Sequence, residues 1–372
     1  MKKVFVDIYL QFNLGDDLFL DILAQRYPNS EFTVNYLGKN YDRFISKYGN
    51  VSRRTYTLFN KIEQRLKLKD SITNYDQVAE EHDALLFIGG SIFREEEYHE
   101  SLYRDRLKMI TEFKIRHKQV FILGANFGPV KTEKFLNDYK QLFEMCDDIC
   151  FRDHYSYSLF KDIPQVRYAP DIVFQMDTSQ FSNSSKNDRI GFSVIDVNHK
   201  NGLARYEDEY IDSSVKAIET LVRNGYECCL MSFCEIEGDL DVIDKIQSKL
   251  TDEVKKKVIV YEYEGNLEEA ITLIASFALF VAARFHANIL AMKLGVGLMP
   301  VIYSEKTVNM LQDNEFADVM VTMENLQLQH SDAVIRKAFT NILKVDMLAK
   351  SASEQFQELD LLLKSNKLSG VI

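Results

Sequence analysis

Arg284 and His286 directly follow the apolar run ALFVAA at residues 278–283. An arginine guanidinium is a planar fork of donors that matches carboxylate and phosphate groups, and a histidine exchanges protons near neutral pH. If the apolar run is a buried strand, both side chains lie at its carboxyl end. The helix expected to start there adds N–H groups and a positive dipole end. The spacing therefore indicates an anion-binding site with a proton donor.

Similar polar groups follow several other apolar runs. NLGDD comes after the first run, GGSIFRE after the fourth, RDHYS after DICF, and a tyrosine and a lysine after GLMPVI. Ligands of parallel α/β sheets bind beyond the carboxyl ends of the strands, so these positions are candidates for one site. The residues concerned are Gly15, Asp16, Gly89, Gly90, Ser91, Arg152, Tyr303 and Lys306.

Each group also has a structural interpretation. Gly15 and Asp16 fit a turn glycine and a helix N-cap, and a glycine pair after a strand can simply open a loop. Arg152 and Asp153 could form a local ion pair, which contributes little at a surface. The stretch CLMSFCEIEGD can likewise be a core strand, a turn and a helix N-cap at Asp239.

The elements that position these residues alternate regularly. Short apolar runs separated by amphipathic helical patterns are typical of parallel α/β sheets. The polar, Ser/Asn-rich stretch DTSQFSNSSKNDR at 177–189 predicts a linker. We therefore expect a Rossmann-like domain at 1–180, a second at 181–330, a cleft between their sheets, and a charged helical segment at 331–372.

Composition excludes several classes of function. A net charge of −11 argues against nucleic-acid binding. No P-loop, GxGxxG, HExxH or GxSxG motif occurs, and neither a metal nor a cofactor is expected. The longest apolar run has 13 residues, too short to span a membrane. Five cysteines without a framework spacing suit a reducing cytoplasm.

The order of the motifs resembles the polysaccharide pyruvyl transferase family. The motifs, which span residues 1 to about 310, are NLGDDLFLDIL, LLFIGGS, ILGANFGP, ICFRDHYS, YAPDIVF and ARFHANILAMKLGVGLMPVIYSEK. The resemblance implies a glycosyltransferase-B-like fold, with the acceptor on the N-terminal domain and the donor on the C-terminal domain. It implies transfer of pyruvate from phosphoenolpyruvate to a sugar as a ketal, with release of phosphate.

The resemblance also implies roles for the candidate residues. Arg152, Arg284 and His286 match positions that the family uses at the phosphoenolpyruvate site, and Asp16 matches its N-terminal Gly-Asp position. We expect His286 and Asp16 to be catalytic, with the division between acid and base left open. The substrate-binding candidates are Arg152, Arg284, Lys306, Tyr303, Gly15, Gly89, Gly90 and Ser91.

The resemblance places the reaction in capsule, exopolysaccharide or cell-wall polymer synthesis. The acceptor would be a sugar or a lipid-linked oligosaccharide, and the expected location is the cytoplasm, with the inner face of the membrane as a candidate. Many members have three glycines where this chain has Gly89, Gly90 and Ser91, so the acceptor stays open, as does the oligomeric state. The rival functions are a nucleotide-sugar glycosyltransferase of the same architecture and a catalytically silent scaffold in polysaccharide assembly.

Overall fold

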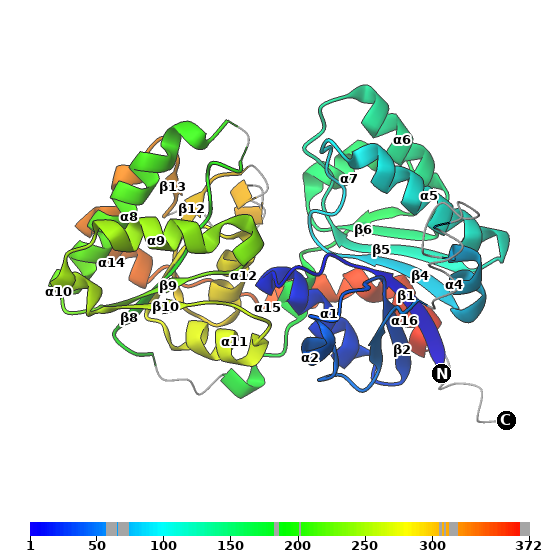
Figure 1. The fold of residues 1–372 in the computed structure, drawn as a ribbon, viewed down its shortest axis with the longest axis horizontal. Helices are drawn as coiled ribbons and strands as arrows, with labels where there is room; N and C mark the ends of the chain where they lie inside the picture. The colour runs from blue at the N-terminus through cyan, green and yellow to red at the C-terminus, as the bar shows by residue number, and fades with distance from the viewer. Residues whose placement is uncertain are drawn as a thin grey trace. The chain divides into compact units, whose positions relative to one another are not determined.

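A computed structural model describes residues 1–56, 65, 74–181, 186–200, 202–304, 307–308, 310–311 and 319–364. Internal contacts divide the chain into two compact units (Figure 1). The first unit comprises Met1–Leu10, Phe19–Ile172 and Lys350–Ile372, and the second comprises Gln11–Leu18 and Val173–Ala349.

The first unit is built on a seven-stranded sheet whose neighbouring strands are all parallel, in the order β3-β2-β1-β4-β5-β6-β7. β4 is buried along its whole length, as expected for a strand with cover on both faces. The direction of strand addition reverses between β1 and β4, where ligands bind in such sheets. The strands are β1 (Lys2–Asp7), β2 (Ser30–Val34), β3 (Val51–Arg53), β4 (Ala84–Ile88), β5 (Gln119–Ala125), β6 (Asp148–Phe151) and β7 (Val166–Tyr168).

An aromatic cluster forms much of the first core. Phe127 stacks on Phe135 at 5.1 Å and meets Phe160 edge-on at 4.8 Å, and Tyr139 packs beside them. Such pairs add about 0.5–1.5 kcal/mol beyond their area burial. The helices that begin in this half of the chain are α1 (Leu14–Arg26), α2 (Asp42–Ile45), α4 (Tyr75–Glu81), α5 (His99–Ile115), α6 (Glu133–Glu144) and α7 (His154–Phe160).

The second unit repeats the same strand order in a six-stranded sheet, β10-β9-β8-β11-β12-β13, again with parallel neighbours. The predicted fold class, two Rossmann-like units with parallel sheets, is therefore confirmed. The strands are β8 (Arg189–Ser193), β9 (Glu227–Met231), β10 (Val258–Tyr261), β11 (Leu279–Ala282), β12 (Gly297–Ile302) and β13 (Val321–Thr322).

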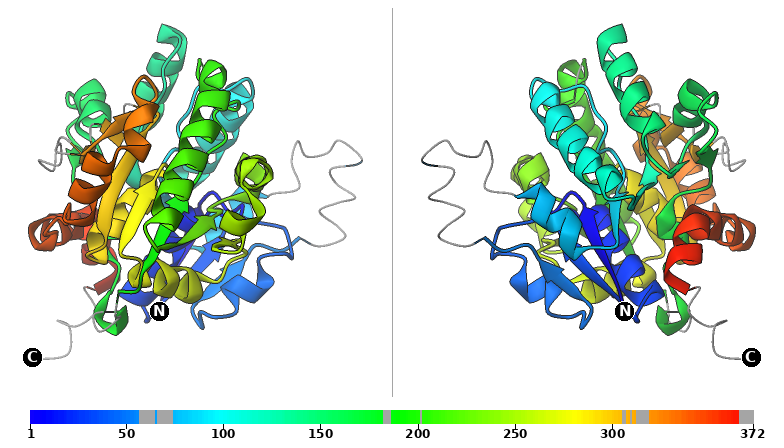
Figure 2. Two further views of the ribbon diagram at one scale, coloured as in Figure 1. Left: turned by 90° about the vertical axis from the view of Figure 1, so that its left-hand side faces the viewer. Right: turned by 90° about the vertical axis from the view of Figure 1, so that its right-hand side faces the viewer.

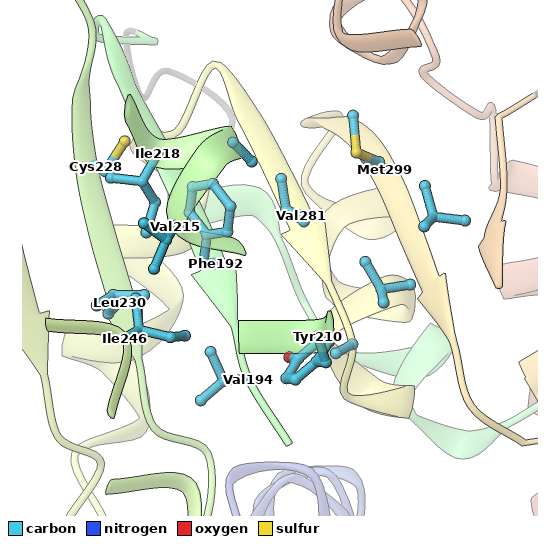
Figure 3. Packing of buried hydrophobic residues seen from close by; sticks show 14 of the residues in the cluster. Phe192, Val194, Tyr210, Val215, Ile218, Cys228, Leu230, Ile246, Val281 and Met299 are labelled. Atoms are coloured by element: carbon cyan, nitrogen blue, oxygen red, sulfur yellow. The ribbon is translucent and has the colours of Figure 1, made fainter. Parts of the chain in front are cut away.

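Helices pack on this sheet around a second apolar core. Figure 3 shows Tyr210, Val215 and Ile218 of α8 against Phe192 and Val281 of the sheet. Because alternate strand residues point to opposite faces, Gly191 and Phe280 turn the other way, toward Phe277 at the end of α11. The helices are α8 (Glu207–Arg223), α9 (Asp239–Lys249), α10 (Asp252–Lys255), α11 (Leu267–Ser276), α12 (Phe285–Lys293) and α14 (Asp332–Phe339).

The C-terminal segment, which the sequence predicts to be helical, consists of several short helices rather than one. It consists of α14, α15 (Asp346–Ala352), a 3-10 turn η6 (Ser353–Phe356) and α16 (Gln357–Lys364), and its last helices are red in Figure 2. Asn341 interrupts the helix because its backbone and side chain both bond to Leu298 of β12. Among the described residues, no helix combines the length and hydropathy that a bilayer crossing requires.

The bounds of the two units differ from the predicted domain ranges. Residues 11–18 pack with the second unit, and the chain leaves the first unit after Ile172 rather than near 180. In the apolar run VRYAPDIVF, which contains the motif YAPDIVF, only Val166–Tyr168 is a strand. Pro170 follows without an N–H to donate, and Ile172–Gln175 forms a 3-10 turn.

Candidate functional site

In the second unit, the site begins where β11 ends. Arg284 takes the N-cap position of α12 in an extended conformation. The backbone N–H groups of Ala283 and Arg284 donate to Ser193 Oγ at 3.0 and 3.2 Å. Asn288 Nδ2 donates back to the Arg284 carbonyl at 2.8 Å. These bonds fix the strand-to-helix turn at the point where β8 and β11 lie side by side.

The Arg284 guanidinium is buried between two carboxylates. Its Nη1 donates to Glu237 Oε2 at 2.5 Å, and its Nη2 pairs with Asp239 Oδ1. Its Nε donates to the Val194 carbonyl at 3.3 Å. Lys200 Nζ adds a second cation, 3.2 Å from Glu237 Oε2. Two cations and two carboxylates therefore balance one another beyond the ends of β8, β9 and β11.

The two carboxylates differ in how firmly they are held. Asp239 has a fully buried side chain, and its Oδ2 accepts from the N–H groups of Phe233 and Cys234 at 2.8 and 3.0 Å. The Glu237 side chain keeps 26% of its surface exposed. Burial would raise the pKa of Glu237, but the charges of Arg284 and Lys200 outweigh burial and hold it well below its usual value. Glu237 is therefore ionised at neutral pH and is the more accessible of the two.

The first turn of α1 packs directly against His286. A methyl carbon added at Gly15 would lie 2.7 Å from His286 Cε1, and nearer still to Nδ1 and Cγ. Only a residue without a side chain allows this approach. The two predicted site residues thus meet, because residues 11–18 belong to the second unit.

Several bonds hold this turn in place. The Leu14 N–H donates to the Phe233 carbonyl at 3.0 Å, and Asn13 Nδ2 donates to Glu237 Oε1 at 3.3 Å. Tyr263 Oη donates to the buried Asp17 carboxylate at 2.7 Å. Asp17 is thus tied into the fold, and the predicted catalytic Asp16 lies next to it, half-buried in the same turn.

A second polar group lies at the carboxyl ends of β4 to β7 in the first unit. Arg152 is buried and donates from Nη1 to Asp171 Oδ2 at 2.8 Å and from Nη2 to Asn126 Oδ1 at 2.6 Å. Ser91 Oγ donates to the same Asn126 oxygen at 2.9 Å. A side chain at Gly90 would lie 2.7 Å from Arg152 Nη1, so the glycine lets the guanidinium rest on the backbone.

The partner of Arg152 differs from the local ion pair that its neighbour suggested. Asp153 caps α7 instead, accepting from the Ser156 N–H at 2.8 Å and its hydroxyl at 2.9 Å. Ser156 Oγ in turn accepts from the Phe127 N–H at 2.8 Å. Asp153 therefore orders the loop after β6, and Asp171 neutralises Arg152.

Gln355, from the C-terminal η6 turn, ties these strand ends together. Its Nε2 donates to the carbonyls of Ala169 and Pro170 at 2.7 and 3.2 Å and to that of Phe151 at 3.4 Å. Its Oε1 accepts from the Gly124 N–H at 2.9 Å. Phe151 precedes Arg152, and Pro170 precedes Asp171. The C-terminal segment thus supports the loops that carry the Arg152 group.

Gly89 and Tyr303 are two further predicted residues that directly follow strands. Gly89 follows β4 with a φ of +144°. Tyr303 follows β12, half-buried, with Lys200 Nζ 5.9 Å from its ring centroid. Lys306 lies outside the described residues. Among the described residues, no cluster of three or more His, Cys, Asp or Glu side chains could hold a metal ion.

The prediction missed the acids and amides that surround the two arginines. These are the acids Glu237, Asp239 and Asp171 and the amide Asn126, and the prediction also missed the cation Lys200. A signal was present, because each follows a strand within about ten residues. Four of them also stand in quoted stretches: Glu237 and Asp239 in CLMSFCEIEGD, Asn126 in ILGANFGP and Asp171 in YAPDIVF. Asp239, read as an N-cap, begins α9 and binds Arg284 instead.

Solved structures place the fold in a known class. The Anabaena protein HepE, solved with UDP and glucose, matches with a TM-score of 0.59 and 13% identity, covering 98% of this chain and 100% of that chain. UDP-N-acetylglucosamine 2-epimerase from Rickettsia bellii gives 0.57 and 12%, covering 100% and 99%. UGT89C1 of Arabidopsis thaliana, complexed with UDP, gives 0.56 and 9%, covering 98% and 99%. These identities show the fold alone, which is glycosyltransferase-B-like.

The family is shown by a direct match of the sequence. The family model for polysaccharide pyruvyl transferase matches residues 13–305 of the 372-residue chain. The chain therefore belongs to the polysaccharide pyruvyl transferase family. The matched range contains Gly15, Arg152, Arg284 and His286, and it stops just before Lys306.

Proposed function

We propose that this protein transfers the pyruvyl group of phosphoenolpyruvate to two hydroxyls of a sugar, forming a ketal and releasing phosphate. The family match over residues 13–305 is the observation that carries the proposal. Arginines and a histidine beyond the carboxyl ends of parallel strands support it, because the donor bears a carboxylate and a phosphate.

The proposed chemistry is an addition followed by an elimination. The first sugar hydroxyl adds to the enol carbon and loses its proton, while the methylene carbon gains a proton and becomes a methyl group. The bond from the former enol carbon to the phosphate oxygen then breaks. The second hydroxyl attacks the same carbon and loses its proton, so the products are the ketal and inorganic phosphate.

His286 is the proposed proton donor, either to the methylene carbon or to the departing phosphate. It lies half-buried in the first turn of α12, and the close contact with Gly15 holds its ring. Positioned proton transfer contributes about 10²–10⁴ in rate. Asp16 is the proposed acceptor for the proton of a sugar hydroxyl, since a carboxylate would repel an anionic donor.

Arg284 is the proposed anion-binding residue of the second unit. Its guanidinium already contacts Glu237 and Asp239, so a donor carboxylate or phosphate must replace one of them. The donor anion would displace Glu237 from Arg284, because the Glu237 side chain is 26% exposed and that of Asp239 is buried. Lys200 and Tyr303 would then face the anion that takes its place.

Arg152 is the proposed anion-binding residue of the first unit, with Gly89, Gly90 and Ser91 supplying backbone and hydroxyl groups. Asp171 and Asn126 orient its guanidinium. The acceptor would be a sugar or a lipid-linked oligosaccharide of a surface polymer, and the proposed location is the cytoplasm near the inner membrane face. Lys306 remains a proposed donor ligand on its motif alone.

Ligand protection tests the donor. A ligand at about 100 times its Kd stabilises a protein by about 2.7 kcal/mol, so thermal unfolding separates donors clearly. We expect phosphoenolpyruvate to raise Tm and UDP to leave it unchanged. Protection by UDP alone would indicate a nucleotide-sugar glycosyltransferase, and protection by neither would indicate a silent scaffold.

Phosphate release from phosphoenolpyruvate, measured with a panel of nitrophenyl and lipid-linked sugars, tests the reaction. His286→Ala should lower turnover by roughly two to four decades and leave donor affinity nearly unchanged. His330→Ala is the matched control, because His330 is also half-buried in the second unit. Equal turnover in the two variants would remove His286 from the mechanism.

A further inference from the structure

The edge strand β10 of the second sheet is exposed at its centre. In the described part of the chain, it pairs only with β9. Ile259 and Val260 are 42% and 43% exposed, and neighbouring strand residues point to opposite faces. Both faces of the strand are therefore accessible at its centre. An apolar edge strand without proline or charge is a template for pairing with another strand.

The backbone of β10 has one row of groups directed outward. The carbonyls of Lys257 and Tyr261 accept from β9, at Cys228 N and Ser232 N. Because the backbone direction alternates along a strand, Val258 and Val260 turn their N–H and C=O groups to the free edge. Two outward residues suffice for a short antiparallel ladder.

Charges of opposite sign flank the strand. Lys255, Lys256 and Lys257 precede it, and the exposed Glu262 and Glu264 follow it. Burial and the neighbouring carboxylates of Glu264 and Glu235 raise the pKa of Glu262. A partner that brings cations to this end would relieve the repulsion.

We propose that β10 pairs antiparallel with β10 of a second copy of this chain, which joins two six-stranded sheets into one. The antiparallel orientation places the lysine end of each strand beside the glutamate end of the other. A parallel arrangement would place lysines beside lysines. The strand carries neither lysine nor proline, so among the devices that protect an exposed edge it keeps only its short length of four residues.

The register follows from the outward groups. In an antiparallel pair, hydrogen-bonded positions must both face the partner. With the two-fold axis at Ile259, Val258 pairs with Val260 of the second copy and Lys256 lies beside Glu262. With the axis at Val260, Val258 would instead oppose Glu262. The first register keeps the apolar residues together and is the one proposed.

The contact is small, because β10 has four residues. Interfaces below about 1,200 Å² are weak and transient. We therefore expect a dimer in the micromolar range, visible as a rise from 43.2 kDa toward twice that mass as concentration increases. Sedimentation velocity or light scattering from about 1 to 200 µM covers this range.

Paired charge reversals provide the decisive test. In Lys256→Glu/Lys257→Glu both ends of β10 are negative, and in Glu262→Lys/Glu264→Lys both are positive. Each variant alone should be monomeric, and an equimolar mixture should form a heterodimer. All four side chains are exposed, so Tm should stay close to wild type. A monomeric wild type, a dimer that survives either reversal, or a mixture that stays monomeric would overturn the proposal.

Discussion

Gly15→Ala tests the contact between α1 and His286 through two opposing effects. Alanine in a helix is worth up to about 1 kcal/mol over glycine. The new methyl group would overlap the imidazole ring, and overpacking costs about 1–3 kcal/mol. Because three ring atoms of His286 lie well inside van der Waals distance, the clash should fall at the upper end of that range and win by about 2 kcal/mol, which lowers Tm by about 4–8 °C in a unit of this size. Displacing the ring by about 1 Å should also cost roughly 10²-fold in turnover.

Thermal unfolding and phosphate release would measure both effects. Gly49→Ala is the matched control, because an added carbon there meets nothing within 4 Å, and its Tm should stay close to wild type. The three atoms nearest to the added carbon at Gly15 all belong to His286. In a His286→Ala background, Gly15→Ala should therefore become neutral or stabilising. An equal loss of stability in both backgrounds would refute the contact.

Three further predictions follow from the buried charges and amides. Glu237→Gln should lower the free energy of unfolding by about 1.5–3 kcal/mol at neutral pH. Because the folded pKa of Glu237 is depressed, its contribution to stability is present above the unfolded pKa of about 4.3. The difference in stability between wild type and variant, measured by urea unfolding, should therefore shrink as pH falls below that value. Arg152→Leu should cost about 3–5 kcal/mol by removing the cation beside the buried Asp171 carboxylate, and adding Asp171→Leu should recover part of the loss in chemical denaturation. Gln355→Leu should lower Tm and weaken phosphoenolpyruvate binding in calorimetry, whereas unchanged affinity would show that Gln355 only stabilises the fold.

The regular part of the fold could be predicted because its signals are local. Buried parallel strands are continuous apolar runs, and ALLFI and LFVA appear as strands where the pattern predicts them. β3 and β13 could not be predicted, since three and two residues carry no periodicity and form through pairing with β2 and β12. The helix break at Asn341 could not be predicted either, because it depends on hydrogen bonds to Leu298, which is distant in sequence.

The strand-end residues of the candidate site could be predicted from the sequence, and their partners could not. Arg152, Arg284 and His286 could be predicted as site residues, because a polar residue after an apolar run can be recognised in the sequence alone. Their partners were not visible as partners: Asp171 and Glu237 are ordinary loop acids until the fold brings them to the arginines.

The sequence by itself determined two parallel α/β sheets, the family, and the residue types available beyond the strand ends. Only the tertiary structure decided that Gly15 touches His286, that Arg284 is neutralised by Glu237 and Asp239, and that residues 11–18 pack with the second unit. The physical reason is range. Strand and helix patterns arise from neighbours a few residues apart, whereas these contacts join residues more than forty positions apart and exist only after the second sheet has formed.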